Sequence, residues 1–563
     1  MSGFELKQRV EAIRQKVEER GLGEVLGRVS PGEVASVGAD ERRVVIDVDF
    51  DTYLRVGARI GEYLGVATIL GSVMLGRVVE VRRRHVAHIA HIQTLYAPVE
   101  DLEGLKTPAQ IVLEPLTECP IDALDCEPTP VYTPVDPLSV VFRPSPEFIA
   151  KMLGLPREGI LLGRLYAGGF ELSVEVRLPE RAMYQHVLVV GTTGAGKTVL
   201  LKNMALSAIY TVRNATVLAL DLQGDYLLTV LPPEAPGVYQ PLDQITVLMP
   251  VTRHLIDRHR ENIQRIATRN LGKEYTLLDV TDERETAELV GRALAELFVE
   301  KTYPGAKVLD AETKTEDKRL VEVVAKVDAG GRVFTLRLLP WAMRFREVYP
   351  EIPRFFPFFS ERVSMLFRRL LEKLAGKDWQ DIDTVMKRLD DVVAKDKNIW
   401  KKLKLHPSQG DNFVRGMYII YETGLFDVSY TVAENKSQKV FATFGEPDYM
   451  ELEGLVVVDL RGFRETPSVA SAVVYRVLSR LFEARDEELT RGAAPSPTFI
   501  FIDEAHYYFP QEGAREDFNK KAAVINKLTR LGRMGVVFAT HNPADLNDLS
   551  QLTNTKIAMR ERA

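Results

Sequence analysis

The stretch Gly191-Thr192-Thr193-Gly194-Ala195-Gly196-Lys197-Thr198 has the residue types and the spacing of a loop that binds phosphate groups. Its glycines let the backbone adopt conformations that a side chain forbids, so successive N–H groups can point at phosphate oxygens. The Lys197 ammonium group can reach the β- and γ-phosphates, and the Thr198 hydroxyl can ligate Mg2+. We therefore expect ATP and Mg2+ as cofactors, with the nucleotide bound by Gly191, Thr192, Thr193, Gly194, Ala195, Gly196, Lys197, Thr198 and Val199.

The elements around this stretch decide between a phosphate loop and an ordinary glycine-rich turn. An apolar run at 187–190 reads as a buried strand that enters the stretch, and residues 199–209 read as a helix that leaves it. A helix that begins here directs the positive end of its dipole at a bound anion. The strand, loop and helix in this order favour the phosphate loop.

A second chemical signature lies about 300 residues later. The apolar run 499–502 ends in Asp503 and Glu504, two carboxylates at the end of a predicted strand. Beside a bound nucleotide, Asp503 would hold Mg2+ through its hydration shell, and Glu504 would orient and polarise the attacking water. Two exposed acids at a strand end are the alternative. Together with the phosphate loop, the pair indicates hydrolysis rather than nucleotide binding alone.

Three further residues are candidates for catalysis. His541 follows Thr540 at the end of the next predicted strand and would lie beside the γ-phosphate as a polar sensor. Arg530 and Arg533 are candidates for a guanidinium that completes a neighbouring subunit's site, where it would stabilise charge on the transferred phosphoryl group. A surface arginine at a helix end is the alternative for each.

Apolar runs that alternate with helical segments predict an α/β fold with a parallel sheet, whose ligands lie at the carboxyl ends of the strands. These runs are 215–221, 455–460, 498–502, 535–540 and 556–559. Short β-prone runs near the N-terminus predict a small barrel, and the stretch between the run that ends at 221 and the run that begins at 455 is too long for a connection. We expect an N-terminal helix (1–22), a barrel (23–143), an ATPase core (144–250 and 451–563) and a mainly helical inserted domain (251–450).

The net charge, the apolar runs and the cysteines of the chain exclude some classes of protein. A net charge of −6 argues against coating nucleic acid by bulk electrostatics, but it leaves room for a locally basic channel. We find no apolar run long enough to span a membrane and no signal segment, so we expect a cytoplasmic protein. Cys119 and Cys126 lack the companions of a zinc site, which leaves a reduced pair or a local disulfide.

Taken together, these motifs resemble the archaeal HerA helicases of the FtsK/HerA ring translocases. Asp221-Leu222-Gln223-Gly224-Asp225-Tyr226 is similar to the family's Asp-Pro-His-Gly-Glu-Tyr, and 532–535 and 539–543 look like its Gly-Arg-Lys-x-Gly and Ala-Thr-Gln-Arg-Pro. The chain departs from the family at Gln185-His186, where Arg-His is usual and where Arg181 could substitute. It departs again at His541, where glutamine is usual.

The resemblance implies a RecA-like P-loop ATPase core that works as a homohexameric ring and moves double-stranded DNA through its pore. It also implies a NurA-type nuclease as partner in resecting DNA ends, with the barrel as docking platform. Two alternatives stay open: a DNA-pumping ATPase of the conjugation or packaging type, and a nucleotide-controlled ring scaffold for a nuclease.

Overall fold

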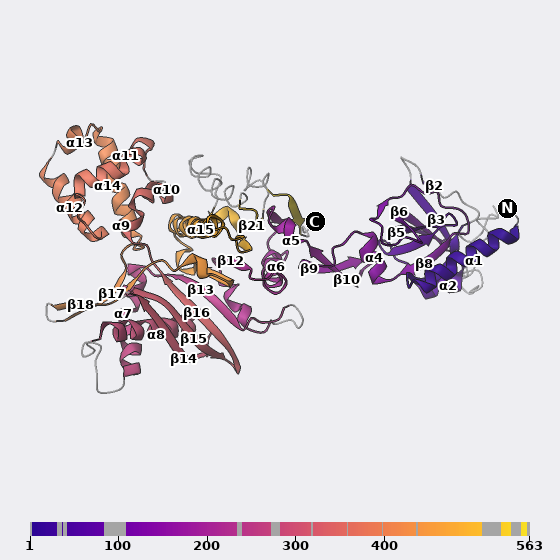
Figure 1. Cartoon of the computed structure of the whole chain (residues 1–563), viewed down its shortest axis with the longest axis horizontal. Coiled ribbons are helices and arrows are strands. Elements are labelled where there is room, and N and C mark those ends of the chain that lie inside the picture. Colours follow the sequence, from indigo (N-terminus) through magenta and orange to yellow (C-terminus); the bar gives the residue numbers. More distant parts are fainter. Residues whose placement is uncertain are drawn as a thin grey trace, which may run out of the picture. The chain divides into compact units, whose positions relative to one another are not determined.

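The computed structural model (Figure 1) describes residues 3–30, 36–37, 42–83, 109–233, 239–271, 282–316, 319–356, 359–396, 398–434, 437–508, 531–541 and 553–559. The chain divides into two compact units, Met1–Pro179 and Glu180–Ala563. None of the helices in these residues is both long and apolar enough to cross a membrane.

The N-terminal unit is built on a closed barrel, as the sequence predicts. Six strands follow one another in the order β3-β1-β8-β4-β5-β6, and β6 pairs with β3 to close the ring. Helix α1 (Gly3–Glu19) packs Val10, Ile13 and Val17 into the adjoining core. The strands are β1 (Gly23–Val29), β3 (Arg42–Val48), β4 (Tyr63–Ala67), β5 (Ser72–Arg83), β6 (Ala109–Pro120) and β8 (Val140–Pro144), with short β2 (Ser36–Val37) and β7 (Thr129–Pro130) attached.

This unit extends further than the boundary expected after residue 143. Strand β8 is the last barrel strand along the chain and lies between β1 and β4. Helix α4 (Pro146–Met152) follows it and buries Phe148 and Met152 in the core that α1 also joins. A hairpin of β9 (Ile160–Ala167) and β10 (Phe170–Leu178) follows. Packing of α4 against the barrel, which the proline-rich composition of this stretch did not reveal, moves the boundary to Pro179. Cys119 and Cys126 form a disulfide.

The second unit contains a RecA-like α/β core. Its parallel strands have the order β13-β19-β12-β20-β21-β11-β22, so one strand, β21, separates the strand that leads to the phosphate loop from the strand that leads to the paired acids. They are β11 (Val187–Val190), β12 (Thr216–Asp221), β13 (Gln244–Pro250), β19 (Gly454–Asp459), β20 (Thr498–Ile502), β21 (Met534–Thr540) and β22 (Thr555–Ala558). Helices α5 (Glu180–Met183), α6 (Lys197–Thr211), α15 (Pro467–Thr490) and α16 (Ala505–Tyr508) complete this core.

The segment 251–450, predicted as a mainly helical inserted domain, differs from this prediction in one respect, because five strands join the core sheet alongside its helices. β16 pairs in parallel with β13, and β15, β14, β18 and β17 extend the sheet beyond it. The strands are β14 (Lys307–Glu316), β15 (Arg319–Ala329), β16 (Arg332–Trp341), β17 (Ser429–Glu434) and β18 (Ser437–Phe444), accompanied by α7 (Arg253–Leu271) and α8 (Glu283–Thr302). Long-range pairing, which local periodicity cannot encode, accounts for the difference.

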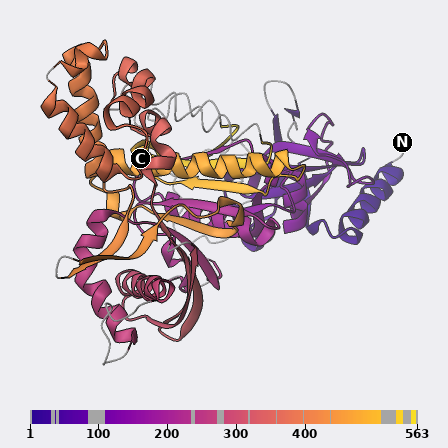
Figure 2. The ribbon, with the colours of Figure 1, turned by 60° about the vertical axis from the view of Figure 1, so that its left-hand side comes forward.

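The predicted helical part of this segment lies between β16 and β17. Figures 1 and 2 show its helices grouped at one end of the unit, apart from β14–β16. Phe359, Phe367 and Phe413 form its aromatic centre, with ring centroids 5.0 and 5.5 Å apart in successive pairs. The helices are α9 (Phe345–Val348), α10 (Ile352–Phe355), α11 (Glu361–Ala375), α12 (Ile382–Lys395), α13 (Ile399–Lys402) and α14 (Pro407–Glu422).

Candidate functional site

The phosphate loop joins β11 to α6, as the sequence predicts. Gly194 and Gly196 have φ angles of 78° and 92°, and Gly196 is the residue that caps the start of α6. A side chain at Gly191 is excluded for a different reason, because its Cβ would lie 2.6 Å from the Cβ of Met559. Thr192, Thr193 and Gly194 are exposed at the tip of the loop, Ala195 is half-buried, and Val199 is exposed on the first turn of the helix.

The Lys197 side chain is buried, with only 5% of its surface exposed. Its ammonium group donates to the carbonyl oxygens of Gly191 at 3.0 Å and Thr192 at 3.4 Å, so it curls back over the loop. Its third contact is His541 Nδ1, at 3.0 Å. The lysine charge is therefore held where the loop backbone converges, which is the place for the phosphates of a nucleotide.

Thr198 and Asp503 form the part of the site that fits a divalent cation. The Thr198 hydroxyl donates to Asp503 Oδ2 at 2.6 Å, across a separation of 305 residues. Asp503 Oδ1 accepts the Glu504 backbone N–H at 2.9 Å, which fixes the carboxylate. Among the residues that the structure describes, no three His, Cys, Asp or Glu side chains gather into a closed metal cage. One hydroxyl and one carboxylate match Mg2+, which completes its shell with water and substrate phosphate.

Glu504 occupies a strained position with φ of +49°, a region that non-glycine residues seldom adopt. Its Oε1 lies 3.0 Å from His541 Nε2, and its Oε2 lies 3.4 Å from His506 Nδ1. Oε2 is buried and accepts no hydrogen bond from the described residues. Oε1 thus lies against His541, and Oε2 lies against His506 without a hydrogen bond from the described residues.

His541 links the two halves of the site. Because an ammonium group can only donate, the contact with Lys197 makes His541 Nδ1 the acceptor. The ring proton must then be on Nε2, from which it is donated to Glu504. Lys197, His541 and Glu504 therefore form one chain of polar contacts, from the phosphate loop to the carboxylate that the sequence assigns as base.

Of the two predicted arginines, the structure describes Arg533, and Arg530 lies outside the described residues. Arg533 precedes β21 at its amino end, where its guanidinium lies 3.9 Å from the Glu180 carboxylate, which also accepts the Tyr184 hydroxyl. The seven residues of β21 separate Arg533 from the catalytic edge by roughly 23 Å at the usual rise per residue. Arg533 is therefore remote from the phosphate loop of its own chain.

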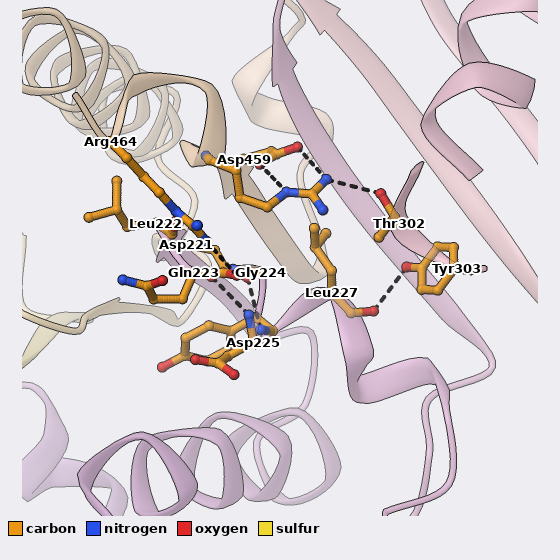
Figure 3. Close-up of polar contacts among 12 residues, drawn as sticks. Asp221, Leu222, Gln223, Gly224, Asp225, Leu227, Thr302, Tyr303, Asp459 and Arg464 are labelled. Carbon is orange, nitrogen blue, oxygen red and sulfur yellow. Dashed lines mark hydrogen bonds and ion pairs between the residues drawn. The ribbon is translucent and has the colours of Figure 1, made fainter. Parts of the chain in front are cut away.

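The Asp221 motif forms a tight turn at the carboxyl end of β12 (Figure 3). The buried Asp221 carboxylate accepts the backbone N–H groups of Gly224 at 2.6 Å, Asp225 at 3.1 Å and Tyr226 at 2.8 Å. Burial raises the pKa of Asp221, and these hydrogen bonds oppose that rise. Its role is to hold the turn, because all three contacts are made to the backbone.

Arg464, which the sequence does not single out, braces this turn (Figure 3), and the Arg461 side chain lies beside Gly224. Arg464 donates to the carbonyl oxygens of Leu222 at 2.8 Å and Gln223 at 3.0 Å. Arg461 binds the Asp459 carboxylate through two nitrogens, at 2.9 and 2.8 Å. The signal for Arg461 was its place directly after the predicted strand 455–460, and Arg464 carried none.

The histidine of the Gln185-His186 pair has a structural role. His186 is fully buried with φ of 59°, and its Nδ1 accepts the Val536 N–H at 3.0 Å. Burial lowers the pKa of His186 to about 4. His186 therefore anchors the start of β11 to β21 as a neutral side chain. Arg181 is exposed on α5.

Several known structures resemble this chain at a distance. They include the conjugative coupling protein TrwB with sulphate (14% identity, covering 71% of this chain and 70% of that chain, TM-score 0.30) and TrwB with ADPNP (14%, 71% and 72%, 0.30). VirB4 of Thermoanaerobacter pseudethanolicus has 12% identity over 72% of this chain and 85% of that chain, with a TM-score of 0.33. No curated protein matches the chain.

Family models give a more specific result. A model described as the central domain of helicase HerA matches residues 160–354, and one described as the helicase HerA-like C-terminal domain matches residues 444–561. The two matches follow one another along the chain and together cover more than half of it. The chain therefore belongs to the HerA helicase family of the FtsK/HerA superfamily.

Proposed function

We propose that the protein hydrolyses ATP with Mg2+ and uses the energy to move along double-stranded DNA. The observation that carries the hydrolytic part is the joined site: Thr198 meets Asp503 at 2.6 Å, and His541 links Lys197 to Glu504 through two contacts of 3.0 Å. A protein that only bound a nucleotide would have no use for a carboxylate held beside the phosphate loop in this way.

In this proposal each residue has a separate task. The loop N–H groups and Lys197 bind the phosphates, and Mg2+ would be held by Thr198 and, through water, by Asp503, where it would neutralise phosphate charge. Glu504 orients and polarises the attacking water through Oε2. His541 holds Glu504 at a fixed position relative to the phosphate loop and senses the γ-phosphate.

The finer assignment follows from family membership. We infer a homohexameric ring in the cytoplasm that translocates duplex DNA and resects DNA ends together with a NurA-type nuclease docked on the barrel. The remote position of Arg533 supports a ring, because this guanidinium can serve a nucleotide only in a neighbouring subunit.

The test is the ATPase rate of the purified chain with and without double-stranded DNA, alongside the mass of the assembly in solution. We expect turnover that duplex DNA stimulates and that Lys197→Ala abolishes. Adding a candidate NurA nuclease then tests for coupled degradation of DNA ends. An ATPase that ignores every form of DNA would contradict translocation, and binding of ATP without turnover, even with nuclease and DNA, would favour a scaffold.

A further inference from the structure

A cavity of about 580 Å³ opens at the carboxyl ends of β13 and β19, and helices α7 and α8 contribute to its walls. No residue of the phosphate loop and neither of the paired acids lines it. Its size is that of a small-molecule site, and its position at the carboxyl edge of a parallel sheet is where such folds bind ligands. We propose that this cavity binds a phosphate monoester carried on an aromatic group, a ligand of mononucleotide size, separately from the nucleotide of the phosphate loop.

The charge of the lining favours an anion. Arg258, His259, Lys301 and Arg461 all line the cavity. Among the described residues no carboxylate pairs with Arg258 or Lys301, whereas Arg461 is already bound to Asp459 through two nitrogens. The lining carboxylates, those of Asp459 and Glu422, are fewer than the cations, which leaves a local excess of positive charge.

The basic side chains of the cavity also lower one another's pKa. The Lys301 ammonium group lies 2.6 Å from His259 Nε2, so it donates to that nitrogen and leaves the ring proton on Nδ1. His259 Nδ1 is buried and has no acceptor among the described residues. Burial and the neighbouring Arg258 and Arg461 lower the pKa of Lys301, and burial, Lys301 and Arg258 lower the pKa of His259. A bound anion would stabilise all of these groups in their protonated forms.

The remainder of the wall is apolar and includes an aromatic ring. Leu255, Leu294, Leu297, Phe298 and Val469 line the cavity, and the Arg461 guanidinium lies 5.6 Å from the centre of the Phe298 ring. An inorganic anion would leave this surface without a contact. A flat aromatic group attached to the anion would cover it, which is why the proposal specifies a phosphate monoester rather than free phosphate.

Calorimetry of the full chain tests the proposal without relying on the proposed function. A Lys197→Ala background weakens nucleotide binding at the phosphate loop, and adenosine monophosphate is the probe. We expect one binding event per chain, weakened about tenfold or more in Lys301→Gln and in Arg258→Gln, because each loses a charge-assisted contact with the phosphate. Lys301 and Arg258 are both exposed at the cavity mouth, so these variants are expected to fold.

Three controls make the result specific. Lys373→Gln, which removes an exposed lysine from α11 outside the cavity, should leave the affinity unchanged. Inorganic phosphate and adenosine should each bind at least tenfold more weakly than adenosine monophosphate. The proposal is overturned if adenosine monophosphate does not bind at about 1 mM, if Lys301→Gln binds it as well as the background does, or if inorganic phosphate binds equally well.

Discussion

Replacing His541 by alanine removes the side chain that lies between Lys197 of the phosphate loop and Glu504, the predicted base. The change deletes the contact from Lys197 to Nδ1 and the contact from Nε2 to Glu504 Oε1, both 3.0 Å long. Lys197 keeps its two carbonyl partners in the loop. Glu504 loses its anchor, and the carboxylate is then free to rotate away from the attacking water.

The size of the effect follows from the hydrogen bonds that are lost. A hydrogen bond to a charged group contributes about 1.5–3 kcal/mol. Because the Glu504 and His541 side chains are 30% and 36% exposed, we count the two bonds together as one. At about 1.4 kcal/mol for each factor of ten in rate, this predicts a kcat that is lower by roughly 10- to 150-fold. KM should change less, because Lys197 retains its position.

Steady-state ATPase kinetics of His541→Ala and His541→Gln, with thermal unfolding as the check on folding, test this reasoning. A glutamine amide has an acceptor oxygen for Lys197 and a donor N–H for Glu504, so His541→Gln should recover most of the kcat. The bridging role is refuted if alanine leaves kcat at the wild-type value, or if glutamine is as impaired as alanine in a folded protein.

Three other outcomes are expected. Glu504→Gln should lower kcat by about 10²- to 10⁴-fold while binding of ATP, measured by calorimetry, persists, because the amide cannot take a proton. Arg533→Ala should also be inactive, and mixing it with Glu504→Gln subunits should restore ATPase activity only if the arginine acts on a neighbouring subunit. His186 has a folded-state pKa of about 4, below its unfolded value near 6.5, so its contribution to stability is complete above pH 6.5 and falls by about 3 kcal/mol toward pH 4. The urea midpoint of His186→Asn should therefore depend less on pH across this window than the wild-type midpoint does.

The sequence predicted those parts of the fold that depend on local patterns. The phosphate loop needs glycine where φ is positive, at Gly194 and Gly196, and its flanking strand and helix follow from periodicity. The strand that precedes Asp503 is an apolar run of the expected length. The barrel was also predictable as a class, although its strand order was not.

The parts that were missed depend on contacts between distant residues. β15 joins β18 in parallel across more than 100 residues, so the pattern of each strand alone gives no sign that 251–450 extends the core sheet. The bridge from His541 to Lys197 spans 344 residues. A motif placed His541 at a strand end, but only the order of β11 and β21 in the sheet brings its ring between the lysine and Glu504.

The same sheet order bears on the proposed role of Arg533. β20 and β21 are parallel neighbours, so Glu504 and His541, which follow them, meet at the carboxyl edge, whereas Arg533, which precedes β21, lies at the amino edge. No change in loop length could move the Arg533 guanidinium from the amino edge of the sheet to the carboxyl edge. Arg533 can therefore stabilise a transferred phosphoryl group only if another subunit presents its carboxyl edge to this chain's amino edge. Such a head-to-tail contact generates a ring when its rotation closes.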